Sequence, residues 1–351
     1  MKLQIGSRIR SARIMAGLSL REFSAKLEGI VSHTAIKKYE DGQLIPDGKT
    51  LLAFAKALNI KTDYFLRPQN IDISQLEFRK KSRLPQRKLN SIKERIIDNI
   101  ERYLELESYL NLPLQFSNPI ANHSILTADD VENAVKDLLD LWDLGTNPIP
   151  NVIELLEDKE IKVVELDTDG EFDGLSGFAN EDIPVIVVNK SFPVERKRFT
   201  AMHELGHLIL SFDPGLSPKQ IEKLCHRFAG AMLLPKETIF QELGKKRQNV
   251  SLNELVYIKE SYGISIQAIM ARAKDLEIIS NDQFVRFRIW VNSHEDHKKE
   301  KGLGEYRGNE ISTRFKQLLY RATAEEIISM SKAASLANIK LASFRDQFMT
   351  I

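Results

Sequence analysis

The sequence predicts a multidomain protein with an all-α N-terminal domain, an α+β middle domain and a mostly helical C-terminal region. Its 351 residues suffice for two or three domains of ordinary size. Short capped helical patterns fill the first 66 residues, whereas β-branched or small-residue runs separate the helices further on. We expect four segments: domain 1–67, a basic linker and long helix at 68–110, domain 111–245, and an accessory region at 246–351.

The composition is globular, but the charge is uneven. Hydrophobic residues make up 42% and charged residues 28%, so wholesale disorder is excluded. Residues 1–110 carry 21 Lys and Arg against 13 Asp and Glu, a net charge of +8, and the remainder carries −7. A basic N-terminal third favours a nucleic-acid-binding module, although an uneven solvated surface would give the same count.

The sequence also indicates where the protein works. No run approaches the ~20 apolar residues of a membrane helix, and the N-terminal segment lacks the apolar core of a signal peptide. Cys225 is the only cysteine, so no intrachain disulfide can form. We therefore expect a cytoplasmic protein with no membrane partner.

The N-terminal helices have the spacing of a helix-turn-helix domain. Ser19 and Glu22 form a capping box that predicts the second helix, Ser32 caps a third helix, and Gly42 ends it. Two short helices joined by a tight turn in a helical domain are the helix-turn-helix arrangement. The segments LSLREFSAKL, VSHTAIKKYEDGQLIP and LLAFAKALNIKTDYFL resemble the XRE family of DNA-binding domains.

This resemblance implies that operator DNA is a partner and that the third helix enters the major groove. A homodimer would then read two half-sites. The alternative is a helical domain that binds protein instead of DNA. The resemblance implies base contacts from Ser32, His33, Thr34 and Lys37, and phosphate contacts from Lys38 and from Arg8 or Arg10.

A basic segment and a long helix follow. Residues 67–95 carry 9 Lys and Arg against 3 Asp and Glu, which suits a linker lying along phosphates, although a solvated charge run is commoner. A helix over 86–110 has apolar residues at a seven-residue repeat, with Asn99 in the seam. The seam could pair two subunits, with Asn99 fixing the register, or pack on the next domain, which we favour.

The middle region combines helices near 128–143 and 151–158 with strand-like runs IKVVEL, DGLSGFA and PVIVVN. A helix from Val194 to Ser211 then carries His203, Glu204 and His207 in an H-E-x-x-H pattern. Residues i and i+4 share one helical face, so both imidazoles can reach one metal. Glu204 lies at the edge of that face, where it can hold a water beside the metal and take its proton.

The next helix, IEKLCHRFAGAMLLP, supplies candidates for the rest of the site. A catalytic zinc needs a third protein ligand, for which Glu222 is our candidate. His226, one turn later, would orient a metal-binding histidine, or less favourably bind the metal itself. We interpret Cys225 as a small buried apolar residue.

The two helices RFTAMHELGHLIL and IEKLCHRFAGAMLLP resemble the ImmA/IrrE family of metallo-endopeptidases. The resemblance extends over nearly the whole chain, and it is weakest at 281–310. It implies a zincin-like (gluzincin) metallopeptidase domain, with Zn²⁺, or Mn²⁺ as the other candidate, held by His203, His207 and Glu222 and with Glu204 as the catalytic glutamate. The chain departs from the family at His226, where Asp or Asn is expected.

We therefore predict a DNA-binding transcriptional regulator fused to a zinc-dependent endopeptidase. It would cleave a repressor-type regulatory protein or itself, with the basic linker at 67–85 as a candidate cut site. The alternative is a regulator or antitoxin whose metal site is structural or sensing, and which sequesters its partner. An intact Glu204 favours the peptidase, because a structural site needs no general base.

Residues outside the metal helix pair supply further candidates. Tyr257, Tyr262 and His226 are candidates for stabilising the oxyanion, and the strands DGLSGFA or PVIVVN for holding a substrate as an added strand. We expect a strand at RFRIW, 286–290, and a solvated loop at HEDHKKEK, 294–301. His123 has no role that the sequence shows.

Overall fold

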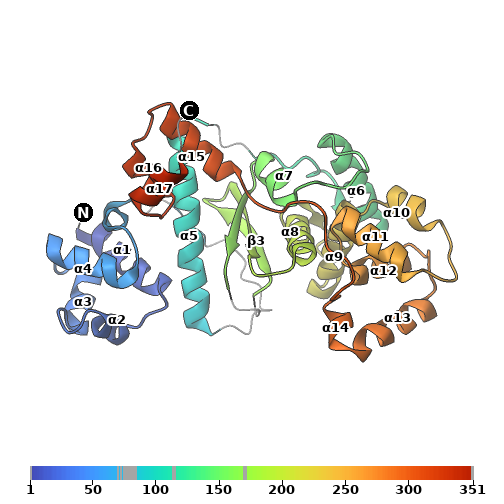
Figure 1. Cartoon of the computed structure of the whole chain (residues 1–351), viewed down its shortest axis with the longest axis horizontal. Helices are drawn as coiled ribbons and strands as arrows, with labels where there is room; N and C mark the ends of the chain where they lie inside the picture. Colours follow the sequence, from blue (N-terminus) through green and yellow to red (C-terminus); the bar gives the residue numbers. More distant parts are fainter. Residues whose placement is uncertain are drawn as a thin grey trace.

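The computed structural model describes residues 2–68, 71, 73, 85–112, 116–168 and 172–348. It confirms the predicted layout, with helices at the N-terminus, small sheets in the middle and helices at the C-terminus (Figure 1). None of the helices described there is long and apolar enough to span a bilayer.

The N-terminal domain is a compact set of short helices. They are α1 (Lys2–Met15), α2 (Leu20–Lys26), α3 (His33–Glu40), α4 (Gly48–Leu58) and the 3₁₀ turn η1 (Thr62–Leu66). Ser19 and Glu22 form the predicted capping box, which lowers the pKa of Glu22 to about 2 because the carboxylate accepts hydrogen bonds. Ser32 caps α3 as predicted. The core contains Ile9, Phe23, Ile36, Phe54 and Phe65.

Helix α5 (Gln86–Tyr109) lies between the N-terminal domain and the middle sheet (Figure 1). Ile92, Ile96 and Ile100 pack on that sheet, and Leu106 packs on the C-terminal helices. The Asn99 amide donates to the Arg95 carbonyl of the same helix. The apolar seam is therefore covered within the chain, the intramolecular packing that we favoured.

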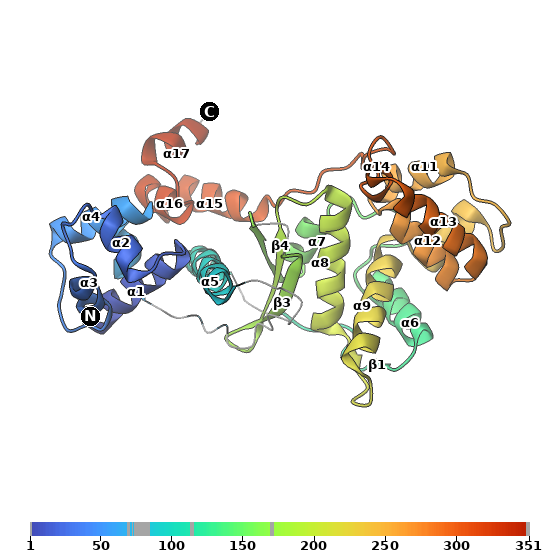
Figure 2. The same ribbon diagram turned by 90° about the horizontal axis from the view of Figure 1, so that it is seen from below.

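The main sheet has the order β2–β4–β3. Strand β4 (Ile183–Asn189) pairs parallel with β2 (Lys162–Leu166) and antiparallel with β3 (Gly174–Ala179). Alternate side chains of β4 point to opposite faces: Val185 and Val187 join the α5 cluster, whereas Ile186 and Val188 join the cluster under α8. The sheet is thus a layer between α5 and α8 (Val194–Ile209) (Figure 2).

The remaining middle helices build the largest core, around α8. They are α6 (Ala128–Leu141), α7 (Val152–Asp158), α9 (Pro218–Leu233), α10 (Lys236–Leu243), α11 (Leu252–Tyr262) and α12 (Ile266–Asp275). Two short strands, β1 (Ser124–Ile125) and β5 (Ser211–Phe212), pair in parallel and bring the entry of α6 beside the end of α8.

Two local predictions beyond residue 280 are wrong. Residues 286–290 lie in a helix, α13 (Asn281–Ser293), because the capping box of Ser280 and Gln283 starts a helix there. Residues 294–301 include a helical turn, α14 (Glu295–Lys298), instead of being only loop. The His297 ring stacks on Trp290, with centroids 4.2 Å apart, which fixes this turn against α13.

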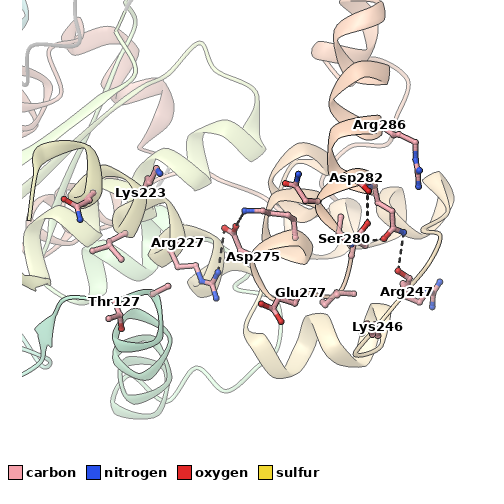
Figure 3. Close-up of a pocket in the computed structure, with 18 of the residues that line it drawn as sticks. Thr127, Lys223, Arg227, Lys246, Arg247, Asp275, Glu277, Ser280, Asp282 and Arg286 are labelled. Atoms are coloured by element: carbon pink, nitrogen blue, oxygen red, sulfur yellow. Dashed lines mark hydrogen bonds and ion pairs between the residues drawn. The ribbon is translucent and has the colours of Figure 1, made fainter.

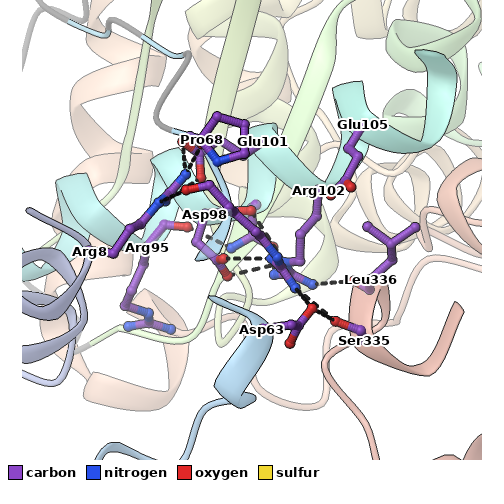
Figure 4. A network of polar contacts seen from close by, with 12 residues as sticks. Arg8, Asp63, Pro68, Arg95, Asp98, Glu101, Arg102, Glu105, Ser335 and Leu336 are labelled. Carbon is purple, nitrogen blue, oxygen red and sulfur yellow. Dashed lines mark hydrogen bonds and ion pairs between the residues drawn. The ribbon is translucent and has the colours of Figure 1, made fainter. Parts of the chain in front are cut away.

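The C-terminal segment returns to the N-terminal domain, as Figures 1 and 2 show. Its helices are α15 (Arg314–Ala324), α16 (Met330–Leu336) and α17 (Leu341–Gln347). Ser335 of α16 contacts Asp63 and Arg67 of the N-terminal domain, and Arg102 of α5 donates to the Leu336 carbonyl (Figure 4).

Candidate metal centre

The candidate metal residues come from α8 and α9, which cross closely. A Cβ on Gly206 of α8 would lie 3.1 Å from the Phe228 ring of α9, so glycine permits this approach. His203 and His207 lie one turn apart on α8, and their Nε2 atoms are 3.1 Å from each other. Glu222 of α9 places a carboxylate oxygen 3.5 Å from the first Nε2 and the other 3.6 Å from the second.

These three side chains fit a zinc ion. Their ligand atoms all lie within 4.8 Å of one another. Ligands about 2.0–2.1 Å from a tetrahedral zinc stand about 3.3 Å apart, and the three separations are 3.1, 3.5 and 3.6 Å. Two imidazoles and one carboxylate are also a donor set that zinc uses in catalytic sites. His203, His207 and Glu222 are called the triad below.

Glu204 is positioned by strand β3. Its Oε2 accepts a hydrogen bond from the Ser176 hydroxyl at 2.7 Å. A Cβ on Gly174 would lie 2.6 Å from Thr200 and 3.3 Å from Glu204, so this glycine lets α8 pack directly on the strand. Ser176 was not among the predicted site residues, because no local pattern marks a residue that is 28 positions from its partner.

Cys225 and His226 contact different triad members. The Cys225 sulfur is buried, as expected, and lies 3.0 Å from His207 Nδ1. The His226 ring packs on the His203 ring, with centroids 4.4 Å apart. His203 Nδ1 is buried without a hydrogen-bond partner among the described residues. The thiol contact could have been found from the spacing, since residues 222 and 225 share one face of a helix.

The other side chains considered for catalysis have different surroundings. The Tyr262 hydroxyl donates to Glu242 of α10 at 3.2 Å, and burial raises the pKa of Tyr262 to about 12. Tyr257 is 55% exposed on α11. His123 pairs with Asp137 of α6 at 3.1 Å. Neither of these two contacts involves the triad, so the structure adds no support for an oxyanion role for either tyrosine.

The residues of the third helix that we expect to contact DNA lie on the surface. Ser32, His33, Thr34, Lys37 and Lys38 are all exposed, and they lie at the start of α3 or on its outer face.

Arg8 cannot contact phosphate as we expected. It is only 1% exposed and forms a two-point ion pair with Glu101 of α5, at 2.7 and 2.9 Å. The neighbouring candidate, Arg10, is exposed. A helical pattern alone did not separate these two arginines, because the helix that buries Arg8 lies about 90 residues further along the chain.

Comparison with known families supports both parts of this description. Residues 9–65 match the helix-turn-helix family model, and residues 156–274 match the model of the IrrE N-terminal-like domain, the M78 peptidase family. A search of the curated proteins returned no match. The chain thus joins a DNA-binding module to a peptidase-family domain. More specifically, it carries an XRE-type helix-turn-helix domain and an ImmA/IrrE-like M78 domain, as the resemblance implied.

Proposed function

We propose that this protein is a transcriptional regulator whose M78 domain hydrolyses a peptide bond in a repressor-type protein or in the chain itself. The observation that carries the proposal is that Glu204 directly follows His203 on the helix that carries both histidines of the triad, with its carboxylate held by Ser176. A structural metal site would need no such carboxylate. Operator DNA would bind at the exposed residues of α3, in a homodimer that reads two half-sites.

The triad would hold zinc, with manganese as the other candidate. When bound, the ion supplies a Lewis acid for the substrate carbonyl and lowers the pKa of a water. Glu204 would take the proton from that water and return it to the leaving amine. The hydrogen bond from Ser176 would hold the Glu204 carboxylate in one orientation, and the thiol of Cys225 would orient the His207 ring.

Strand β3 is the favoured place for the substrate backbone. It lies at the edge of the β2–β4–β3 sheet, and it carries Ser176 beside Glu204. An extended peptide can pair with such an edge through main-chain hydrogen bonds. PVIVVN, our other candidate, is the central strand and already has a neighbour on each side. We therefore propose that the substrate adds to β3.

The proposed domain limits remain 1–67, 68–110, 111–245 and 246–351, with cytoplasmic localisation. The candidate cut site at 67–85 falls mostly outside the described residues. A cut there is still testable, because it would create a new N-terminus in a known stretch of sequence.

The test compares new protein N-termini in cells that express wild type or Glu204→Gln at equal levels. The substitution keeps the shape of the side chain but removes the general base, so bound metal should be unchanged while cleavage is lost. Glu222→Gln is the matched variant, which should lose metal as well. A site cut only by wild type supports the proposal. If neither variant changes the cleavage pattern, in growth or under stress, the non-catalytic regulator or antitoxin is the better description.

A further inference from the structure

A large pocket lies beside α9, where Lys223 and Arg227 of that helix line it (Figure 3). Gln220, Lys223, Leu224 and Arg227 of α9 line it, whereas Glu222 points toward the histidines of α8. The loop at 246–248 and the segment from α12 into α13 form other parts of its wall. Its volume is about 1230 Å³, above the 300–1,000 Å³ or so of ordinary small-molecule sites.

The pocket is cationic, although the part of the chain around it is acidic. Six basic and three acidic side chains line it, a net charge of +3, whereas residues 111–351 together carry −7. The basic residues are Lys223, Arg227, Lys246, Arg247, Lys274 and Arg286. A concentration of positive charge in a hollow attracts anions and raises their local concentration.

Half of these cations are already neutralised. Arg227 pairs with Glu132, Arg247 with Glu254, and Lys274 with Asp275. Within the described part of the chain, no ion pair involves Lys223, Lys246 or Arg286, and each comes from a different part of the wall. Two lining carboxylates, Glu277 and Asp282, likewise form no ion pair with a described residue. The three cations outnumber these two carboxylates by one, and they lie at separate points of the wall, where a ligand with several negative charges can contact more than one of them.

A smaller, apolar pocket continues from the cationic one. It has a volume of about 360 Å³ and shares four residues with the larger pocket, including Arg286 and Gln283. Phe287, Trp290 and Met270 are among its lining residues. Aromatic side chains of this kind favour planar ring systems by stacking. Arg286 therefore lines both pockets, at the boundary between the cationic one and the apolar, aromatic one.

We infer that this composite pocket binds a nucleoside polyphosphate, with its phosphates at Lys223, Lys246 and Arg286 and its base near Phe287 and Trp290. The two halves match the two parts of such a ligand, many charges at one end and a planar ring at the other. This inference does not depend on the proposed peptidase activity, since none of the triad lines either pocket.

The test is calorimetric titration of the full-length protein with ATP, tripolyphosphate and adenosine in separate runs. ATP should bind most tightly, and its affinity should fall with added salt because the contacts are ionic. Lys223→Glu and Arg286→Glu should each weaken ATP binding about tenfold or more, a change of about 1.4 kcal/mol. Phe287→Ala should weaken ATP but leave tripolyphosphate unchanged.

Lys219→Glu is the matched control, because Lys219 is exposed on the same helix but does not line the pocket. It should bind ATP as wild type does, and circular dichroism should show all variants folded. The inference is overturned if no probe binds, or if ATP binds the two pocket variants as tightly as the control. The second outcome would place the nucleotide elsewhere, such as on the basic N-terminal domain.

Discussion

Replacing Arg198 by methionine should destabilise the middle domain strongly. Arg198 and Glu310 are both fully buried, and their ion pair joins α8 to the C-terminal segment at 2.5 Å. The same guanidinium donates to the carbonyls of Ile149, Tyr262 and Gly263. Methionine removes the charge and every donor, so Glu310 would be left as a buried carboxylate that accepts a hydrogen bond from the Ile153 amide but has lost its cation.

The expected loss in the free energy of unfolding follows from that burial. Removing one partner of a buried ion pair costs about 3–5 kcal/mol. Arg196→Met, two residues earlier on α8, is the control, because its pair with Asp173 is more than half exposed on both sides. An exposed pair is worth about 0–1 kcal/mol.

Urea unfolding followed by tryptophan emission measures both changes. The chain has two tryptophans, at positions 142 and 290, and neither lies in the N-terminal domain or the C-terminal helices α15–α17. The emission therefore reports the middle region. A loss under 1 kcal/mol for Arg198→Met, or equal losses for the two variants, would refute the argument from burial.

Three further outcomes are expected. Ser176→Ala should lower the rate of peptide cleavage about tenfold at unchanged metal content, because a hydrogen bond to a charged group is worth about 1.5–3 kcal/mol. Unchanged cleavage at normal metal content would show that Ser176 has no part in catalysis. Gly206→Val should place a side chain against the Phe228 ring, move α9 away from α8 and reduce the zinc retained on dialysis. Full zinc retention would show that the two helices can move apart without weakening the metal site. Burial raises the pKa of Glu157 to about 7, so the folded state binds a proton that the unfolded state releases near 4.5. Stability is then lost as pH rises from about 4.5 to 7, by at most about 3 kcal/mol. Melting curves of Glu157→Gln at several pH values should lack this loss of stability. If wild type and Glu157→Gln lose stability equally as the pH rises, the buried Glu157 carboxyl is not its cause.

Signals confined to one helix could be predicted from the sequence. The capping box of Ser19 and Glu22 and the cap at Ser32 depend on residues at most three apart, and the structure confirms them. The i, i+4 histidines on α8 likewise depend only on helical geometry. The structure brings Glu222 to both because α8 and α9 pack closely at Gly206.

Features that depend on distant partners could not be predicted. The hydroxyl of Ser176 reaches Glu204 only because β3 packs against α8. Arg8 is an ion-pair residue in place of a phosphate contact because α5 returns to cover it. The prediction of a strand at 286–290 is wrong for a different reason. The capping box at Ser280 starts a helix there, in spite of the short alternating pattern of these residues. In each case tertiary packing or a neighbouring cap decided the outcome, not the local pattern.

The polar contacts shown in Figure 4 would hold the molecule together after a break in the chain between residues 68 and 85. Arg8 of α1 is bound to Glu101, and Ser335 of α16 contacts Asp63 and Arg67, so the residues before and after such a break are joined without the linker. A nicked molecule should therefore migrate as one particle in gel filtration, and separate into two fragments only in denaturant. Cutting the backbone alone would leave the helix-turn-helix domain attached to the rest of the molecule. Its release from the rest of the molecule would need a second event that opens the Arg8–Glu101 ion pair and the hydrogen bonds of Ser335.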